Sequence, residues 1–305
     1  MRVVCMDKIA FVFAGQGSQA VGMGRDLYDH FGSARQLFDM SASIRDLCWN
    51  GPKEQLDITI NSQPALFLTD LACAAALTEN GVEAGGAAGF SLGEIPAACY
   101  AGLMTSLQAF NFVCHRAQAM HDCSEKQKGC MFAVVKLSSD QIESICMGIP
   151  QAYPANYNCP GQTVVACAAS SAEALRQAVT DHGGKALLLP VSGAFHSPLM
   201  DAAGESVAAY LEKENLGALG IPLYANITAR AYGDPRELLS RQINHPVLWQ
   251  RTIERMVSDG FDTFIEVGPG KTLSGFIKKT SPDVRIYSVS DMESLEKTMK
   301  GLQDA

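Results

Sequence analysis

The sequence has no long hydrophobic run, and the start of the chain has no export signal. No apolar stretch in its 305 residues approaches the ~20 residues that cross a bilayer. Residues 1–8 (MRVVCMDK) lack the apolar region and cleavage site of a signal peptide. We therefore expect a cytoplasmic protein with no membrane association.

Closely spaced cysteine pairs are also missing. All ten cysteines lie between Cys5 and Cys167, and none forms a C-x-x-C pair. In a chain of this size without an export signal, the pattern predicts reduced thiols and not a disulfide framework. Zinc needs clustered Cys and His at ligand spacing, which His115, His121 and Cys123 only approximate. We expect no metal.

Positive charge is scarce as well. The chain has 24 Lys and Arg against 32 Asp and Glu, which gives a net charge of −8. Nucleic-acid binding is therefore not expected, because phosphate binding needs a basic surface. A content of 47% hydrophobic and 18% charged residues is typical of a soluble globular protein, and the length allows one large domain or a domain with an insert.

The order of apolar patterns predicts the fold. In the first ~125 residues, strand-like and helix-like segments alternate, which is typical of a parallel sheet with helices on both faces. Residues 126–192 instead follow a βαββαβ order, which is ferredoxin-like. The α/β pattern then returns with a helix after Pro198, a strand at 223–226, a helix at 246–260 and a strand at 263–267.

The prediction is an α/β-hydrolase-like parallel-sheet domain, residues 1–125 and 193–305, with an inserted ferredoxin-like subdomain at residues 126–192. In the insert, the strands are expected at 131–137, 152–158, 163–169 and 185–191, and the helices at 138–146 and 172–182.

The most informative segment is Gly89-Phe90-Ser91-Leu92-Gly93. It fits the G-x-S-x-G nucleophile elbow, in which a serine sits on a tight strand-to-helix turn. Glycine is required on both sides because a side chain there would collide with neighbouring backbone.

Two further segments supply the other parts of an acyl-transfer site. An apolar run at residues 9–13 leads into Ala14-Gly15-Gln16-Gly17, and such a strand–turn–helix start offers backbone N–H groups to a developing anion. His196, in the segment Gly193-Ala194-Phe195-His196-Ser197, follows a strand-like run. A serine nucleophile needs such a base within reach.

With these motifs in order, the chain resembles the malonyl-CoA:acyl-carrier-protein transacylases. The chain has the family's motifs in the same order and at similar spacing: GQGSQ, G-x-SLGE, an Arg in the next helix, GAFHS and EVGPG. The resemblance runs from about residue 9 to about residue 279. It implies a ferredoxin-like insert at the place predicted above.

The resemblance also implies a role for each site residue. Ser91 would be the nucleophile and His196 the general base, and the backbone N–H groups of Gln16 and Leu92 would form the oxyanion hole. A carbonyl just before the Pro-Val segment, which maps to His245, would orient the histidine. Phe195 would favour malonyl over methylmalonyl. Gln63 would support the site, although its position as a polar residue at a helix start explains it equally well.

Arg116 distinguishes this family from ordinary esterases. It shares an apolar stripe with Ala109, Phe112 and Ala119, so its charge is drawn away from open water. A buried guanidinium needs an anion, and its fork matches a carboxylate bidentately. The free carboxylate of malonyl would serve. The alternative is a structural ion pair or an arginine that reaches the surface.

Two positions near the motifs need separate interpretation. Phe90 stands where the family usually has histidine, so any substrate contact of that imidazole is lost. Glu94 is interpreted as a helix-start carboxylate. Three lysines, Lys271, Lys278 and Lys279, are better explained as solvated surface residues than as a patch for CoA phosphates or carrier protein.

The predicted function is malonyl transfer from malonyl-CoA to the phosphopantetheine thiol of acyl carrier protein, by a ping-pong mechanism through malonyl-serine. It would supply fatty-acid synthesis, with no cofactor, in a monomer. The alternatives are a transferase of a polyketide pathway, an acyl-thioester hydrolase with the same Ser/His pair, and a non-catalytic carrier-protein docking module. Arg116 argues against the hydrolase, because a carboxylate clamp has no use with simple acyl groups.

Overall fold

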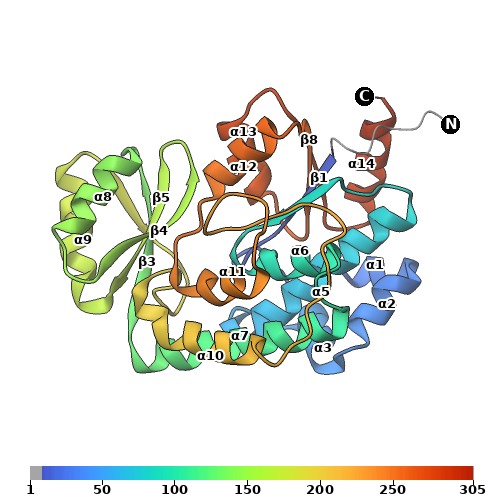
Figure 1. The fold of residues 1–305 in the computed structure, drawn as a ribbon, viewed down its shortest axis with the longest axis horizontal. Coiled ribbons are helices and arrows are strands. Elements are labelled where there is room, and N and C mark those ends of the chain that lie inside the picture. The colour runs from blue at the N-terminus through green and yellow to red at the C-terminus, as the bar shows by residue number, and fades with distance from the viewer. Residues whose placement is uncertain (1–8, 305) are drawn as a thin grey trace. The chain divides into compact units, whose positions relative to one another are not determined.

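A computed structural model describes residues 9–304 of the chain (Figure 1). Residues 1–8, which were searched above for an export signal and include Cys5, lie outside the described residues. The chain divides into two compact units. Unit 1 comprises Met1–Cys114, Asn215–Tyr224 and Arg255–Ala305, and unit 2 comprises His115–Glu214 and Ala225–Glu254.

Unit 1 contains a five-stranded sheet in the order β7-β2-β1-β8-β9, and every neighbouring pair is parallel. Its central strand has the sequence IAFVF and is buried at every position. A continuous apolar run is what a strand covered on both faces requires. The strands are β1 (Ile9–Phe13), β2 (Gly86–Gly89), β7 (Leu223–Tyr224), β8 (Thr263–Val267) and β9 (Arg285–Val289).

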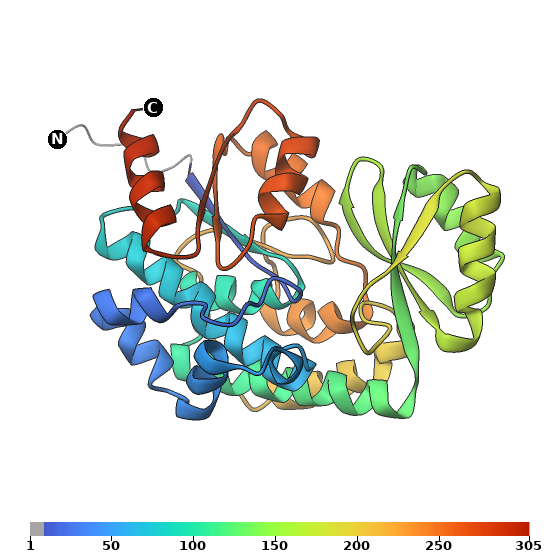
Figure 2. The same ribbon diagram turned by 180° about the vertical axis from the view of Figure 1, so that it is seen from behind.

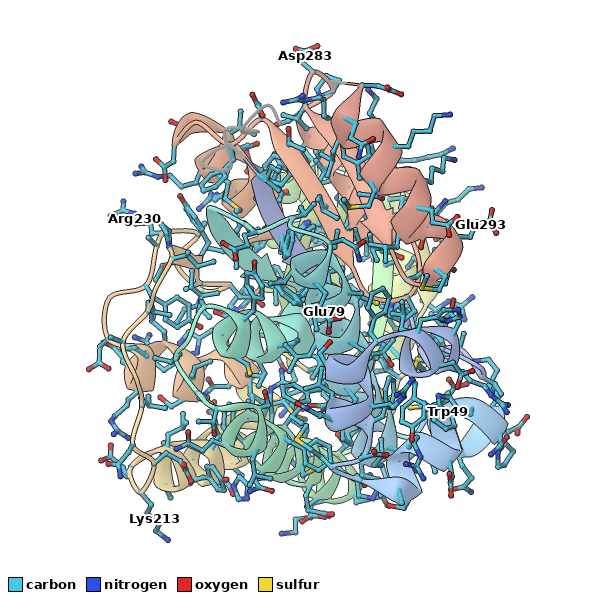
Figure 3. All side chains as sticks on the ribbon, turned by 90° about the vertical axis from the view of Figure 1, so that its right-hand side faces the viewer. Trp49, Glu79, Lys213, Arg230, Asp283 and Glu293 are labelled. Carbon is cyan, nitrogen blue, oxygen red and sulfur yellow. The ribbon has the colours of Figure 1, made fainter. Side chains whose placement is uncertain are left out.

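Helices of unit 1 pack on this sheet and on one another. The first strands are covered by α6, and β9 packs against α13 and α14. An aromatic cluster joins the N-terminal helices. Trp49, labelled in Figure 3, lies edge-on to Tyr28 with ring centroids 4.8 Å apart. The helices are α1 (Arg25–His30), α2 (Gly32–Phe38), α3 (Ala42–Asn50), α4 (Lys53–Leu56), α5 (Thr59–Glu79), η2 (Ser91–Gly93), α6 (Glu94–Tyr100), α13 (Thr272–Thr280) and α14 (Met292–Gln303).

Unit 2 contains a four-stranded antiparallel sheet in the order β4-β5-β3-β6. Helices α8 and α9 lie on one of its faces (Figures 1 and 2). The chain order of these six elements is βαββαβ, as predicted. They are β3 (Gly129–Val135), α8 (Ser139–Met147), β4 (Ala152–Cys159), β5 (Gln162–Ala168), α9 (Ala172–Asp181) and β6 (Lys185–Leu188).

The remaining elements of unit 2 follow or connect the sheet. Two helices, α7 (Ser106–Lys126) and α12 (Trp249–Ser258), begin in one unit and end in the other. The others are η3 (Ala169–Ser171), η4 (Pro198–Met200), α10 (Asp201–Leu211), α11 (Pro235–Arg241) and η5 (Gln242–Asn244). Across residues 9–304, no helix combines the length and the apolar character that a membrane crossing requires.

The predicted combination of a parallel sheet and a separate antiparallel sheet is confirmed, but three elements are shorter than predicted by two residues or more. Strand β6 ends at Leu188 instead of residue 191, because Pro190 has no N–H for the ladder. Strand β7 ends at Tyr224, and Ala225 N donates to Arg230 O. Helix α12 starts at Trp249 and not at Pro246, since Val247 is extended and bridges to Asn156.

Candidate active site

The G-x-S-x-G segment of unit 1 forms a sharp turn between strand β2 and helix α6. A Cβ added to Gly89 would lie 1.9 Å from the carbonyl of Gly93, and one added to Gly93 would lie 2.2 Å from the Phe13 carbonyl oxygen. No real Cβ tolerates such distances from backbone, so the steric reason for both glycines is confirmed. Ser91 itself has φ of 53°, a left-handed conformation that is strained for a residue with a side chain. The elbow therefore holds Ser91 in a left-handed backbone conformation.

The glycine turn after β1 packs against this elbow. A Cβ at Gly15 would lie 2.6 Å from the Phe90 carbonyl oxygen, and Phe90 N donates to Phe13 O at 3.0 Å. Gln16, one of the predicted oxyanion donors, directly follows Gly15, and Leu92, the other, lies two residues after Phe90. The structure thus brings their two segments together within unit 1.

Helix α5 contacts the same glycine turn. Thr59 in its first turn donates a hydrogen bond to Gln16 Oε1 at 2.9 Å. Gln63, one turn further along, is fully buried. Phe90, within the elbow, and Glu94, directly after it, are both packed in unit 1. Glu94 is buried at the first position of α6, and Phe90 packs on Phe276 of α13 with ring centroids 6.1 Å apart.

In unit 2, His196 lies in the loop between β6 and η4 and is only 2% exposed. Its φ is 58°, so the histidine has the same left-handed backbone conformation as Ser91. Its backbone N–H donates to Ile243 O at 2.8 Å, and its ring Nδ1 lies 2.9 Å from Gln242 O. Because a carbonyl only accepts, Nδ1 carries the proton in the neutral ring. In this tautomer Nε2 is the ring nitrogen that carries the lone pair.

Arg116 on α7 is buried at 1% exposure. Its Nη2 donates to the side-chain oxygen of Gln242 at 2.8 Å. The sequence prediction that this charge is withdrawn from water is therefore correct. Gln242 is the residue that sequence reasoning missed: its carbonyl receives His196 and its side chain receives Arg116.

The pKa of His196 is lowered from its ordinary value of 6.5 to about 4. Burial is the main cause, and the positive charge of Arg116 adds to it, while the backbone carbonyls of Gln242 and His245 oppose the shift. Both effects penalise the imidazolium. The ring is therefore neutral at physiological pH, the state that a general base requires.

The other predicted residues of unit 2 lie around this histidine. The backbone of His245, the predicted orienting carbonyl, favours the charged ring but less than that of Gln242 does. The Nδ1 atom of its side chain lies 2.9 Å from Arg241 O. Phe195 is 5% exposed, and its ring fills the space at Gly193, where a Cβ would lie 2.6 Å from it.

The chain as a whole matches the acyl transferase domain model over residues 10–303. The protein belongs to the acyl transferase family. It is 34% identical over 312 residues to the malonyl CoA-acyl carrier protein transacylase of Bacillus subtilis, with 98% of each chain covered.

Solved structures of acyl transferases agree. The malonyl CoA-acyl carrier protein transacylase of Clostridium perfringens superposes with a TM-score of 0.94 at 35% identity, covering 97% of this chain and 98% of that one. A malonyl-transacylase in complex with a type II polyketide acyl-carrier protein superposes with a TM-score of 0.92 at 31% identity, covering 96% of this chain and 99% of that one.

Serine acyltransferases and hydrolases often orient the base with a carboxylate, but here a carbonyl has that place. The aspartates between Ser91 and His196 in the chain, Asp122, Asp140 and Asp181, are exposed, and no carboxylate is among the groups that shift the pKa of His196. The signal for Gln242 in the sequence was only its position three residues before His245.

The residues considered for zinc have other contacts. His115 stacks on Tyr210 with ring centroids 4.6 Å apart, and Cys123 Sγ lies 3.3 Å from Leu199 O. Within residues 9–304, no group of three His, Cys, Asp or Glu side chains is arranged to hold a metal ion. The three lysines, Lys271, Lys278 and Lys279, are exposed.

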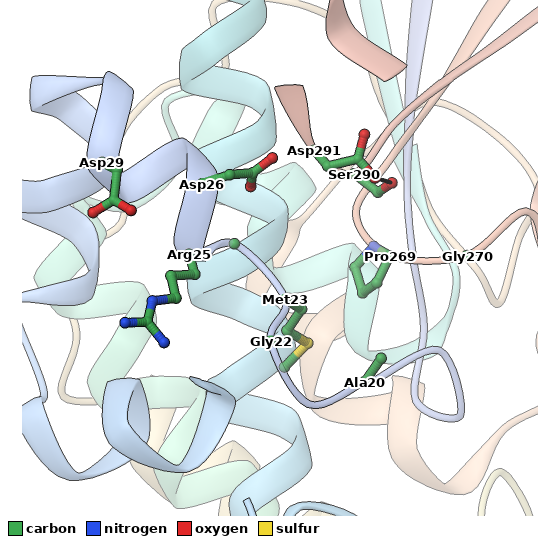
Figure 4. Close-up of a pocket in the computed structure, with 11 residues that line it drawn as sticks. Ala20, Gly22, Met23, Arg25, Asp26, Asp29, Pro269, Gly270, Ser290 and Asp291 are labelled. Carbon is green, nitrogen blue, oxygen red and sulfur yellow. Dashed lines mark hydrogen bonds between the residues drawn. The ribbon is translucent and has the colours of Figure 1, made fainter. Parts of the chain in front are cut away.

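Cavities occur in both units of the described chain. One of about 440 Å³ in unit 2 is lined by His196 together with Tyr153, Tyr157 and His245, so His196 borders open space. A larger cavity of about 530 Å³ in unit 1 lies among α1 and the segments after β8 and β9, with Asp26 and Asp291 at its edge (Figure 4). It includes none of the predicted site residues, and we assign it no role in acyl transfer.

Proposed function

We propose that this acyltransferase moves a malonyl group from malonyl-CoA to the phosphopantetheine thiol of acyl carrier protein through a malonyl-serine intermediate. The observation that carries the proposal is the buried guanidinium of Arg116. Gln242 holds this guanidinium with its side chain and holds the neutral ring of His196 with its backbone carbonyl. A buried positive charge calls for an anion, and malonyl differs from simple acyl groups in carrying a carboxylate. The relatives named above act on this substrate according to their names.

In the first half-reaction, Ser91 Oγ attacks the thioester carbonyl while His196 Nε2 accepts its proton. The developing oxyanion is received by the backbone N–H groups of Gln16 and Leu92, and donors of this kind lower such barriers by roughly 3 kcal/mol each. The proton then passes from His196 to the departing CoA thiolate. A covalent intermediate divides the thiol-to-thiol transfer into two easier steps.

In the second half-reaction, the thiol of the carrier protein gives its proton to His196 and attacks the acyl-serine. The ester bond to Ser91 breaks, and His196 returns the proton to Ser91 Oγ. Because its pKa is lowered to about 4, His196 is neutral and can accept a proton in both half-reactions. The Gln242 carbonyl keeps the imidazole in the tautomer with the proton on Nδ1 throughout. Arg116 holds the malonyl carboxylate by charge-assisted hydrogen bonds during both steps.

The setting we propose is a cytoplasmic monomer that serves fatty-acid synthesis and uses no cofactor beyond its two thioester carriers. A related malonyl-transacylase forms a complex with a polyketide acyl-carrier protein, which supports a carrier protein as the acceptor. Phe195, packed beside His196, would exclude the extra methyl of methylmalonyl. One methyl group supplies only about 1–3 kcal/mol of discrimination, so the preference is strong but not absolute.

Intact-protein mass spectrometry tests the proposal directly. The protein is mixed with malonyl-CoA and then with holo acyl carrier protein. We expect one malonyl adduct that is absent in Ser91→Ala, retained in the control Ser106→Ala, and discharged onto the carrier. An adduct that decays to water at the same rate with or without carrier would instead identify a hydrolase, and carrier binding without any adduct would identify a docking module.

A further inference from the structure

Two cysteines face each other across the antiparallel sheet of unit 2. Cys130 on β3 is directly opposite Cys167 on β5, and their Sγ atoms are 3.6 Å apart. Neither residue belongs to the acyl-transfer site, so a role for the pair is independent of the proposed function.

The backbone around the pair has the dimensions of a disulfide. Ala169 N donates to Lys128 O at 3.1 Å, and the ladder alternates between hydrogen-bonded and non-hydrogen-bonded pairs. Cys130 and Cys167, two positions along, are therefore a hydrogen-bonded pair, for which the Cα separation is about 5.5 Å. Disulfides most often join Cα atoms about 5.5–6 Å apart. Side-chain rotation is then enough to bring the two sulfurs to bonding distance.

The two thiols differ in their access to solvent. Cys167 is fully buried in the core cluster of the sheet, and Cys130 is half-buried and packs against that cluster. Burial raises the pKa of Cys167 to about 12, and its contact with Cys130 acts in the same direction. A small solute in water therefore reaches Cys130 first, whereas Cys167 reacts only with a group already beside it. Reactive and resolving cysteines in redox-sensitive proteins are often arranged in this way.

We propose that Cys130 and Cys167 form a reversible redox site whose oxidant is a hydroperoxide. The Cys130 sulfur attacks one peroxide oxygen, the O–O bond breaks, and Cys130 becomes a sulfenic acid. The other oxygen leaves with the thiol proton, as water from hydrogen peroxide or as an alcohol from an alkyl hydroperoxide. The Cys167 sulfur then attacks the Cys130 sulfur. The S–S bond forms, the S–O bond breaks, and the hydroxide leaves as water with the proton of Cys167. The thiols lose two electrons, the peroxide gains them, and a dithiol reductant reverses the change.

A third cysteine provides the control. Cys146 on α8 is buried in the same cluster, and its charge state influences the pKa of Cys167. It is not opposite either residue in the sheet ladder. If proximity within the core were sufficient, Cys146 would compete for Cys167. If the cross-strand geometry decides, it would not.

The test uses the full-length protein and hydrogen peroxide. After oxidation, remaining thiols are blocked with N-ethylmaleimide, and the digest is examined for a peptide that joins Cys130 to Cys167. We expect this cross-link, with loss of two hydrogens from the pair and full reversal by dithiothreitol. It should be absent in Cys130→Ser and in Cys167→Ser and retained in Cys146→Ala.

Three results would overturn the proposal: both thiols still open to alkylation after oxidation, Cys130 converted to sulfinic acid without a cross-link, or a cross-link from Cys146 in the wild-type chain. The wild-type experiment needs no variant, so poor folding of a substituted protein does not affect the decision.

Discussion

Arg116 and Gln242 are 126 residues apart in the chain and are joined by a buried hydrogen bond of 2.8 Å from Nη2 to Oε1. The backbone carbonyl of the same glutamine lies 2.9 Å from the ring of His196. One residue therefore fixes both the positive charge and the tautomer of the neighbouring histidine. It connects the group proposed to bind the substrate carboxylate with the group proposed to move its proton.

The first prediction concerns Gln242→Glu. A carboxylate at this position would pair with the Arg116 guanidinium and compete with the malonyl carboxylate for it. We expect kcat/KM for malonyl-CoA to fall by ~10–100-fold, the size of a lost charge-assisted interaction of about 1.5–3 kcal/mol. Gln118→Glu is the matched control, because Gln118 is exposed on the same helix as Arg116. An unchanged rate in Gln242→Glu would show that Arg116 does not bind the substrate.

The second prediction separates substrates. Arg116→Ala should weaken malonyl transfer by ~10–100-fold, while acetyl transfer, which involves no carboxylate, should suffer much less. Steady-state kinetics with malonyl-CoA and acetyl-CoA give the comparison. Equal losses for both acyl groups would mean that Arg116 supports the fold or the base rather than the substrate.

The third prediction concerns pH and activity. Because the pKa of His196 is lowered to about 4, the rate of Ser91 malonylation should persist below pH 6.5 and fall only as pH approaches 4. Arg116 contributes to this lowering, so Arg116→Ala should move the acid limb upward. Rapid-quench acylation over a pH series measures both. An acid limb near pH 6.5 in the wild type would contradict the buried, neutral histidine.

The same histidine links pH to stability. Its folded-state pKa of about 4 lies below the ordinary value of 6.5, so the unfolded chain binds more protons between these values. The contribution of His196 is thus fully present above about pH 6.5 and is lost as pH falls toward 4. Denaturant unfolding of the wild type and of His196→Gln should show a smaller loss for the variant across this window. Parallel curves would disprove the linkage.

The fourth prediction concerns the elbow. Gly93→Ala should abolish acylation and lower the melting temperature severely, since the new Cβ would lie 2.2 Å from the Phe13 carbonyl. Gly275→Ala in α13 is the control, because no atom lies within 4 Å of its Cβ position. Alanine there should stabilise the helix by about 0.5–1 kcal/mol. Scanning calorimetry and malonylation distinguish the two, and a well-folded, active Gly93→Ala would refute the steric account.

The features that could be predicted from the sequence are those with a local physical cause. The five apolar residues of β1 predict a buried strand, and the flanking glycines of Ser91 follow from the closeness of backbone segments. The β9 strand was not predicted, because Arg285–Val289 is partly exposed at all but its last residue and so has no clear apolar pattern.

Gln242 was missed for a different reason. Its carbonyl acts on His196, and no side-chain pattern reports what a carbonyl does. Its side chain acts on Arg116 across 126 residues, a proximity that only the folded chain creates. His245, which the resemblance indicated, is three residues away on the same loop and does contribute to the pKa of His196.

The left-handed backbone shared by Ser91 and His196 limits which amino acids can replace them. A φ near 55° at both positions is disfavoured most strongly for β-branched residues. Threonine, which has the same hydroxyl as serine, is therefore a poor replacement at position 91, whereas cysteine preserves both the backbone and a nucleophile. Efforts to give this scaffold a new acyl chemistry should accordingly begin from Ser91→Cys, and libraries that exclude Val, Ile and Thr at both positions would spend fewer variants on chains that cannot form the turn.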